Sequence, residues 1–233
     1  MDTPIESKSQ ARTLTTTSYG VLSILALRSH STYELTKQMR RSLHYLWPRA
    51  ESNVYAESKR LVDAGLAEGR VERNGGRRRT IYSITQAGRD ALATWLDSPS
   101  APQRYESEAL MKVFFAENGT KDGLLASIRA LRDDALAAIE HFQELAELYD
   151  AGEGQYPHRF ALSGLVARLI CEQHAATARW ASWAEQQVSA WDGPSGANAD
   201  WGVETLRAAG EPFLLRDDPV QEAMLARRSR KGS

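Results

Sequence analysis

The spacing of apolar positions predicts three short helices at the start of the chain. Residues 17–28 (TSYGVLSILALR) are dense in aliphatic side chains, which indicates a short and largely buried helix. Ser31 stands three residues before Glu34, the arrangement of a capping box, so a second helix is expected to begin there. Pro48 suits the first turn of a third helix, because its missing N–H would be unpaired there anyway, and Gly65 suits that helix's left-handed C-terminal end.

The pattern then changes to one that is typical of strands. The segments LAEGRVER and TIYSIT suit two strands, and the Asn-Gly-Gly turn between them favours a hairpin because positive φ costs little there. Thr85 is placed to cap a fourth helix, QAGRDALATWLD, which ends near Pro99. Three helices, a two-stranded hairpin and a fourth helix describe a winged helix-turn-helix domain, which we expect over residues 17–97.

A second and wholly helical part is predicted after a linker at residues 98–104 (SPSAPQR). From residue 122 the apolar positions are spaced alternately four and three apart, a 3.5-residue period that is typical of a coiled-coil-like seam. The seam positions that we expect to mediate dimerisation are Leu124, Ile128, Leu131, Phe142, Leu145 and Tyr149. A further long helix is expected over roughly residues 158–191.

One alternative is that these helices pack only against each other within one chain. A short domain with exposed seams, however, more naturally pairs with a second copy of the chain. We therefore expect residues 105–191 to form a coiled-coil-like dimerisation domain with a possible effector site. The polar residues 1–16 are expected to form a flexible N-terminal arm, and residues 192–233 a loosely ordered C-terminal tail. The predicted fold class is mainly α with a small β-hairpin: a winged helix-turn-helix domain followed by an α-helical dimerisation domain.

The composition is that of an ordinary globular protein. Of the 233 residues, 42% are hydrophobic and 25% are charged, which argues against a disordered chain. No apolar stretch approaches the ~20 residues that a membrane span requires, so no membrane partner is expected. The N-terminal segment lacks the apolar core of a secretory signal, and a single cysteine, Cys171, excludes an internal disulfide. A cytoplasmic location is therefore expected.

The net charge of −1 conceals an uneven distribution of charge. Residues 1–98 carry 15 Lys+Arg and 10 Asp+Glu, a net +5, whereas residues 99–226 carry 10 and 20, a net −10. The last seven residues, RRSRKGS, restore the balance with +4. This asymmetry suggests that the first half meets a polyanion, although chance clustering would give the same result.

Arg77, Arg78 and Arg79 stand at the tip of the predicted hairpin. In a winged helix the recognition helix enters the major groove while the hairpin tip reaches backbone phosphate or the minor groove. Guanidinium forks suit phosphate oxygens. A charge run in isolation is usually a solvated face, but its position after a third helix with polar outward residues favours DNA contact.

The third helix supplies the other candidate DNA contacts. Asn53 suits an adenine edge, and Arg49 or Lys59 suits a guanine or a phosphate. Ser52 and Tyr55 suit phosphate contacts, with packing of Tyr55 against the wing as an equal alternative. No operator sequence follows from these residues.

Three blocks of the sequence, TYEL, NVYAESKRLVDAGL and RRRTIYSITQAGRDAL, resemble the DNA-binding domain of the PadR family of transcriptional regulators. The positions that match the family's pattern are Tyr33, Glu34, Leu35, Tyr55, Lys59, Arg60, Leu61, Gly65, Leu66, Tyr82, Thr85, Gly88 and Arg89. Thr32 stands where the family usually has Gly, and Ser58 stands where it usually has Leu, which removes an apolar contact from the third helix. The second half resembles the C-terminal helical domain of the longer family members.

The resemblance implies a homodimer that represses transcription by covering a palindromic operator in double-stranded DNA, and it adds Tyr33 to the candidate DNA contacts. In some family members a small, often aromatic, effector binds and releases the DNA. Trp180 and Trp183, three apart on one helical face, are the candidate stacking surface. Aromatic residues at helical spacing more often belong to a core, so that interpretation is favoured.

No enzymatic or metal site is predicted. His141, His158 and His174 lack the spacing of metal ligands, and no phosphate loop, nucleophile elbow or paired catalytic carboxylates occur. We therefore expect a regulator without a cofactor, not an enzyme. The competing hypothesis is a winged helix used for protein contact, with the helical domain as a dimerisation or adaptor module.

Overall fold

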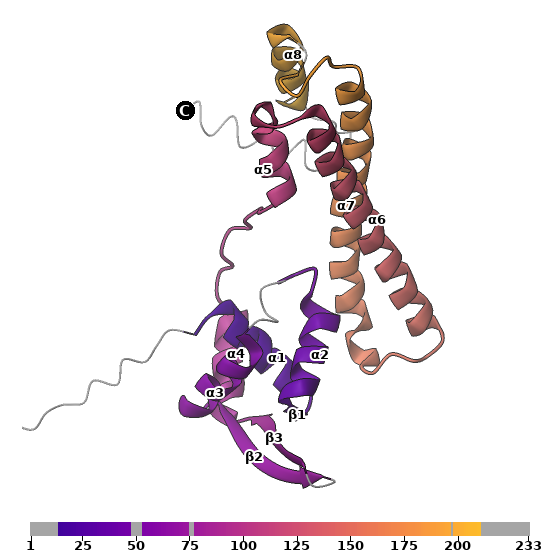
Figure 1. Cartoon of the computed structure of the whole chain (residues 1–233). Coiled ribbons are helices and arrows are strands. Elements are labelled where there is room, and N and C mark those ends of the chain that lie inside the picture. The colour runs from indigo at the N-terminus through magenta and orange to yellow at the C-terminus, as the bar shows by residue number, and fades with distance from the viewer. Residues whose placement is uncertain (1–13, 48–52, 75–76, 197, 211–233) are drawn as a thin grey trace, which may run out of the picture. The chain divides into compact units, whose positions relative to one another are not determined.

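The computed structural model describes residues 14–47, 53–74, 77–196 and 198–210 (Figure 1). The chain divides into two compact units, Met1–Arg104 and Tyr105–Ser233, which we call the winged-helix unit and the helical unit. The predictions for residues 1–13 and 211–233 lie outside the described residues. Within the described ranges, no helix has both the length and the apolar character that a membrane crossing requires.

The described part of the winged-helix unit consists of four helices and one antiparallel sheet. The helices are α1 (Thr16–Leu25), α2 (Thr32–Leu43), α3 (Val54–Asp63) and α4 (Gln86–Leu96). The strands are β1 (His30–Ser31), β2 (Ala67–Asn74) and β3 (Arg77–Ile84), in the order β1-β3-β2. Figure 1 shows the β2–β3 hairpin extending from the helices of this unit.

The sheet has one strand more than the predicted hairpin. β1 places His30 opposite Tyr82 and Ser31 opposite Ile81. Sequence patterns identify a strand by alternation over several residues, and a strand of two residues offers none. The fold class is otherwise confirmed.

Local hydrogen bonds explain where the helices begin and end. Ser31 accepts a hydrogen bond from the backbone N–H of Glu34, and Glu34 Oε2 accepts one from the backbone N–H of Ser31 at 2.7 Å, so the predicted capping box is confirmed. Thr85 Oγ1 caps α4 by accepting from the N–H of Gly88 at 3.1 Å. Gly65 has φ 73°, the left-handed conformation predicted for it after α3.

The start of α3 is only partly described. Asn53 is its N-cap residue and makes no side-chain cap hydrogen bond. Pro48, the predicted start of this helix, lies outside the described residues, as do Arg49 and Ser52.

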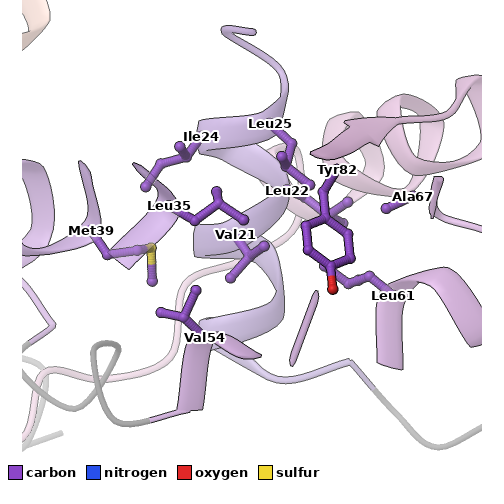
Figure 2. Close-up of a cluster of buried hydrophobic side chains, with 10 residues drawn as sticks. All are labelled: Val21, Leu22, Ile24, Leu25, Leu35, Met39, Val54, Leu61, Ala67 and Tyr82. Carbon is purple, nitrogen blue, oxygen red and sulfur yellow. The ribbon is translucent and has the colours of Figure 1, made fainter. Parts of the chain in front are cut away.

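The core of the winged-helix unit lies between α1, α2, α3 and the base of the sheet. Figure 2 shows its buried side chains, which come from all four elements: Val21, Leu22, Ile24, Leu25, Leu35, Met39, Val54, Leu61, Ala67 and Tyr82. Burial of each large aliphatic side chain contributes about 1.5–3 kcal/mol relative to exposure. Leu27, which was predicted to belong to the first helix, lies beyond its end and is only partly buried.

The helical unit is formed around two long helices. Its described helices are α5 (Glu108–Phe114), α6 (Lys121–Asp150), α7 (Phe160–Ser189) and α8 (Ala199–Gly210), with 3₁₀ turns η2 (Ala116–Asn118) and η3 (Pro157–Arg159). Figure 1 shows α6 and α7 side by side along most of their length. The prediction of two long helices is confirmed.

The predicted seam is buried inside the chain over its first half. Leu124 and Ile128 pack against Ala181, Ala184 and Val188 of α7. Leu131 is also buried. These three seam side chains therefore offer little surface to a second copy, and the expectation that they lie exposed for dimerisation is corrected. Residues further along the seam, Phe142, Leu145 and Tyr149, are partly buried.

The segment after residue 192, predicted to be a loose tail with one or two weak helical turns, contains a regular helix. α8 spans 12 residues. Trp201 of α8 lies parallel to Trp183 of α7, with ring centroids 6.2 Å apart, and edge-on to Trp191 at 5.2 Å. Aromatic contact thus holds the helix near the end of α7, a long-range effect that local composition does not reveal.

Candidate nucleic-acid interface

The recognition helix α3 presents a buried and an exposed side. Val54, Ser58 and Leu61 are buried. Asn53 and Lys59 are exposed, and Tyr55 is 67% exposed. The alternative in which Tyr55 is half-buried against the wing is therefore wrong. The exposed set combines an amide, a phenol and an ammonium, which are groups that contact base edges and phosphates.

Tyr33 extends the exposed polar surface to α2. It is the second residue of that helix, directly after the Ser31–Glu34 capping box, and it is 77% exposed. A phenol that is exposed to this extent contributes little to the core. It is free to donate a hydrogen bond to a phosphate oxygen near the helix N-terminus.

The register of the hairpin arranges the arginines of the wing on two faces. Arg73 lies directly opposite Arg78, and Glu72 lies directly opposite Arg79. Directly opposed residues of an antiparallel pair share one face of the sheet. Arg79 donates to Glu72 Oε2 at 3.4 Å, so its charge is partly balanced, and Arg70 lies 3.7 Å from the same carboxylate.

Arg73 and Arg78 have no such compensation. Both side chains are exposed, and neither has an acidic partner among the residues that the structure describes. Like charges directly opposite on a sheet are destabilising by several tenths of a kcal/mol. This arrangement costs stability in the free protein and becomes favourable when a polyanion lies against that face.

Arg73 is a candidate that the sequence reasoning missed. The predicted Asn-Gly-Gly turn does not by itself give the strand register, and it is the observed register that places Arg73 opposite Arg78. The backbone of Arg77 pairs with Asn74 at the end of the hairpin, and its side chain lies outside what the structure describes.

The candidate effector residues have different environments. Trp180 packs against the core of the helical unit, as the core interpretation predicts. Trp183 is 41% exposed and borders a hollow of about 450 Å³ on the surface of α6 and α7. The other residues that line it are Arg132, Leu136, Ala178, Arg179, Ser182 and Gln186.

The two arginines that line this hollow differ in whether a carboxylate balances their charge. Glu185 accepts hydrogen bonds from Arg129 and Arg132, which hold the pKa of its carboxyl below the usual value. Arg179 has no acidic partner within the described ranges. Trp183 and an uncompensated guanidinium therefore border the same hollow. Across the described residues, no group of three His, Cys, Asp or Glu side chains is placed to hold a metal ion.

Two protein-family models match the chain in succession. The Transcriptional regulator PadR-like family matches residues 21–94, and Virulence activator alpha C-term matches residues 106–189. The chain belongs to the PadR-like family of transcriptional regulators. The two matched segments coincide with the winged-helix unit and with α5 to α7 of the helical unit.

Among its relatives, this PadR-like chain is 27% identical to the negative transcriptional regulator PadR of Bacillus subtilis over 99 residues. That match covers 42% of the chain and 54%, about half, of the relative. The structure of B. subtilis PadR in complex with operator DNA has a TM-score of 0.63 at 20% identity, over 76% of this chain and 99% of that one. The same protein has also been solved in complex with p-coumaric acid, with a TM-score of 0.56.

A solved structure of a protein named as an activator is also similar to this chain. The virulence activator AphA of Vibrio cholerae is 26% identical, with a TM-score of 0.55, over 75% of this chain and 98% of its own. The proteins similar to this chain thus include one named as a negative regulator and one named as an activator.

Proposed function

We propose that this chain is a DNA-binding regulator that acts in the cytoplasm as a homodimer and represses transcription from a palindromic operator. The observation that carries the proposal is the opposed pair Arg73 and Arg78 on the wing, beside an α3 whose exposed side is polar. A like-charged cross-strand pair has no benefit for the fold alone. The structure of B. subtilis PadR in complex with operator DNA supports the same kind of ligand for this chain.

In this mechanism each element of the winged-helix unit has a separate task. Asn53, Tyr55 and Lys59 on α3 enter the major groove and contact base edges and nearby phosphates. Arg73 and Arg78 bind the backbone beside that groove and fix the position of α3 along the duplex. Tyr33 adds a phosphate contact from the start of α2.

A second copy supplies the second half of the operator contact. The proposed dimer surface is an exposed apolar stripe on α7, whose members are spaced three and four residues apart: Leu162, Leu165, Val166 and Leu169. An exposed stripe of this kind marks an interaction surface, and two-fold pairing presents it to its own copy. Phe142, Leu145 and Tyr149 of α6 remain proposed contributors.

The hollow beside Trp183 is the proposed effector site. Its chemistry suits a planar aromatic acid, because an indole face stacks on an aromatic ring and the Arg179 guanidinium binds a carboxylate. The p-coumaric acid bound to B. subtilis PadR is a ligand of this class. Bound ligand would favour one conformation of the helical unit and thereby shift the affinity for DNA.

The direct test is selection of binding sites from random double-stranded DNA. The proposal expects the purified full chain to enrich a palindromic sequence, and a reporter carrying that sequence to be silenced when the chain is expressed. Failure to enrich any sequence, with a chain that is folded and dimeric, would leave the adaptor hypothesis as the better account.

A further inference from the structure

A polar cluster connects the recognition helix to the first turn of α1. Its members are Thr15 and Ser18 from the start of α1 and Glu57 and Arg60 from α3. Ser18 Oγ donates to Glu57 Oε2 at 2.9 Å, and Arg60 Nη2 donates to the same carboxylate oxygen at 2.7 Å. Arg60 Nη2 also donates to Ser18 Oγ and, at 3.3 Å, to Thr15 Oγ1. We call these four residues the α1–α3 latch.

The hydroxyl oxygens of Thr15 and Ser18 both cap α1 and bind the α3 side of the latch. Ser18 Oγ accepts the backbone N–H of Thr15 at 2.9 Å, and Thr15 Oγ1 accepts the backbone N–H of Ser18 at 3.2 Å. The cap of α1 is therefore built into the contact with α3. The Glu57 carboxylate lies at the N-terminal end of α1, where the helix dipole favours a negative charge.

The centre of the latch, where Ser18 meets Glu57, is largely shielded from solvent, whereas Thr15 is exposed and the Arg60 side chain is 29% exposed. The side chain of Ser18 is fully buried, and that of Glu57 is 12% exposed. Bidentate or multiple charge-assisted hydrogen bonds in such a place fix geometry as well as contribute energy. Exposed pairs, in contrast, contribute little.

The apolar packing of α3 against the core is interrupted at Ser58, the residue after Glu57 of the latch. Its buried residues are Val54, Ser58 and Leu61, and Figure 2 shows the two hydrophobic ones on opposite sides of the core. Ser58, between them, contributes only a hydroxyl that donates to the carbonyl of Val54 at 2.8 Å. A serine here packs less surface than a leucine would, so apolar contact alone leaves the rotation of α3 about its own axis less constrained.

The latch lies on a different flank of α3 from Tyr55 and Lys59. At 3.6 residues per turn, the mean direction of Glu57 and Arg60 is roughly 150° from that of Tyr55 and Lys59, and the neighbouring Lys59 and Arg60 are about 100° apart. With side chains about 5–6 Å from the helix axis, a rotation of about 20° would move the DNA-facing groups by about 2 Å. A hydrogen bond to a base edge does not survive a displacement of that size.

We propose that Glu57 and Arg60 are positioning residues for sequence recognition: through Ser18 they fix the rotation of α3 and thereby aim Tyr55 and Lys59 at the base edges. This proposal rests on the proposed function. It assigns no DNA contact to either residue. Loss of the latch should remove discrimination between sequences and leave phosphate-driven binding by the wing in place.

The test compares two duplexes of equal length, one selected by the wild-type chain from random DNA and one of mixed sequence. Arg60→Met keeps an aliphatic stem but loses the guanidinium, and Glu57→Gln keeps the size and loses the charge. Each variant should bind the selected duplex at least tenfold more weakly than the wild type. Its affinity for the mixed duplex should stay within about twofold, with an unchanged salt dependence.

Two control variants distinguish an effect on the orientation of α3 from an effect on folding stability. Lys59→Met should weaken binding to both duplexes and lower the salt dependence, because this residue is proposed to contact DNA itself. Leu92→Ala, a buried residue of α4, gives a destabilised chain with the latch intact, and its ratio of the two affinities should equal that of the wild type at a temperature where it is folded. If Arg60→Met does not fold, Glu57→Gln decides the question.

The proposal is overturned if both latch variants keep the wild-type ratio of affinities, whether or not their melting temperatures fall. It is also overturned if they lose both affinities in parallel. A wild-type chain that selects no sequence contradicts the proposed operator binding, and the latch proposal with it, even if it binds DNA with a steep salt dependence. A wild-type chain that binds no DNA contradicts the proposed function, and the latch proposal with it.

Discussion

Arg73 of β2 and Arg78 of β3 are directly opposed across the hairpin, and both guanidinium groups are exposed. Two adjacent cations without an acidic neighbour among the described residues repel each other in the free protein. The proposed DNA phosphate converts this repulsion into attraction. A trade between stability and binding is therefore expected: removing one of these cations should raise the stability of the free protein and lower its affinity for DNA.

Arg78→Glu tests that trade. Because it replaces a like-charged cross-strand pair by an oppositely charged one, it should raise the free energy of unfolding by up to about 1 kcal/mol. The same variant should bind DNA more weakly, since it brings a negative charge to the phosphate backbone. Denaturant unfolding and fluorescence anisotropy measure the two effects. A variant that is less stable, or that binds DNA as the wild type does, would contradict the assignment.

Leu165 and Leu169 are predicted to lie in the dimer interface. Leu165 is 72% exposed, so replacing it by Glu costs little in the isolated chain but places a charge in the proposed apolar contact. Leu165→Glu should therefore shift the protein toward monomer in analytical ultracentrifugation. Its circular dichroism should be unchanged.

Ile128→Ala is the matched variant for the buried side of the same unit. Ile128 is 1% exposed and packs against α7, so its truncation should lower the free energy of unfolding by about 2–5 kcal/mol. It should not change the association state of the molecules that remain folded. If Ile128→Ala dissociated the dimer and Leu165→Glu did not, the seam of α6 would be the interface after all.

The winged-helix unit should lose stability in mild acid. His30 is 1% exposed, neither ring nitrogen has a hydrogen-bond partner among the described residues, and burial, followed by the charge of Arg28, lowers its pKa. Glu34 opposes this shift only in part. A lowered pKa means that the unfolded chain takes up the proton first, so stability present above pH 6.5 declines as the pH falls toward the folded-state pKa.

His30→Leu should flatten that decline between about pH 7 and pH 5, as measured by urea unfolding of the winged-helix transition. Burial also lowers the pKa of His174, in the helical unit. His174→Gln therefore serves as the control, and it should leave the transition of the winged-helix unit unchanged. An identical pH dependence in wild type and His30→Leu would show that this imidazole is not the titrating group.

The effector proposal predicts a specific optical change. p-Coumarate should quench part of the tryptophan fluorescence by stacking on Trp183 and should release the DNA. Arg179→Ala should weaken both effects at least tenfold, because it removes the cation that binds the carboxylate. Equal quenching in wild type and Trp183→Leu would place the ligand elsewhere.

Local chemistry made much of the fold predictable. The Ser31–Glu34 capping box, the Thr85 cap and the left-handed Gly65 depend on neighbours within a few residues, and all three are as expected. β1 and the stacking of Trp201 on Trp183 depend on contacts between distant segments. A period of 3.5 shows that one face of α6 is apolar, but it does not reveal whether α7 or a second copy covers that face.

The residues of the candidate site differ in how far the sequence alone predicts them. Exposure of Tyr33, Tyr55 and Lys59 follows from helical spacing, since the apolar residues determine which side faces the core. Arg73 depends on the register of the strands, which the predicted Asn-Gly-Gly turn does not give and which the pairing of Asn74 with Arg77 establishes. The α1–α3 latch was also beyond sequence patterns, since Ser18 and Arg60 are 42 residues apart in the chain.

The central claim is that the wing and α3 bind DNA through its phosphates and base edges. The most direct measurement is the dissociation constant for the selected duplex across a range of salt concentrations, for the wild type and for the double variant Arg73→Ala/Arg78→Ala. The wild type should show a steep linear dependence of log affinity on log salt, and the double variant a slope shallower by about 3.6, or about 0.9 for each of the four phosphate contacts that the dimer loses. Equal slopes for the two proteins, or no measurable binding by the wild type, would contradict the account.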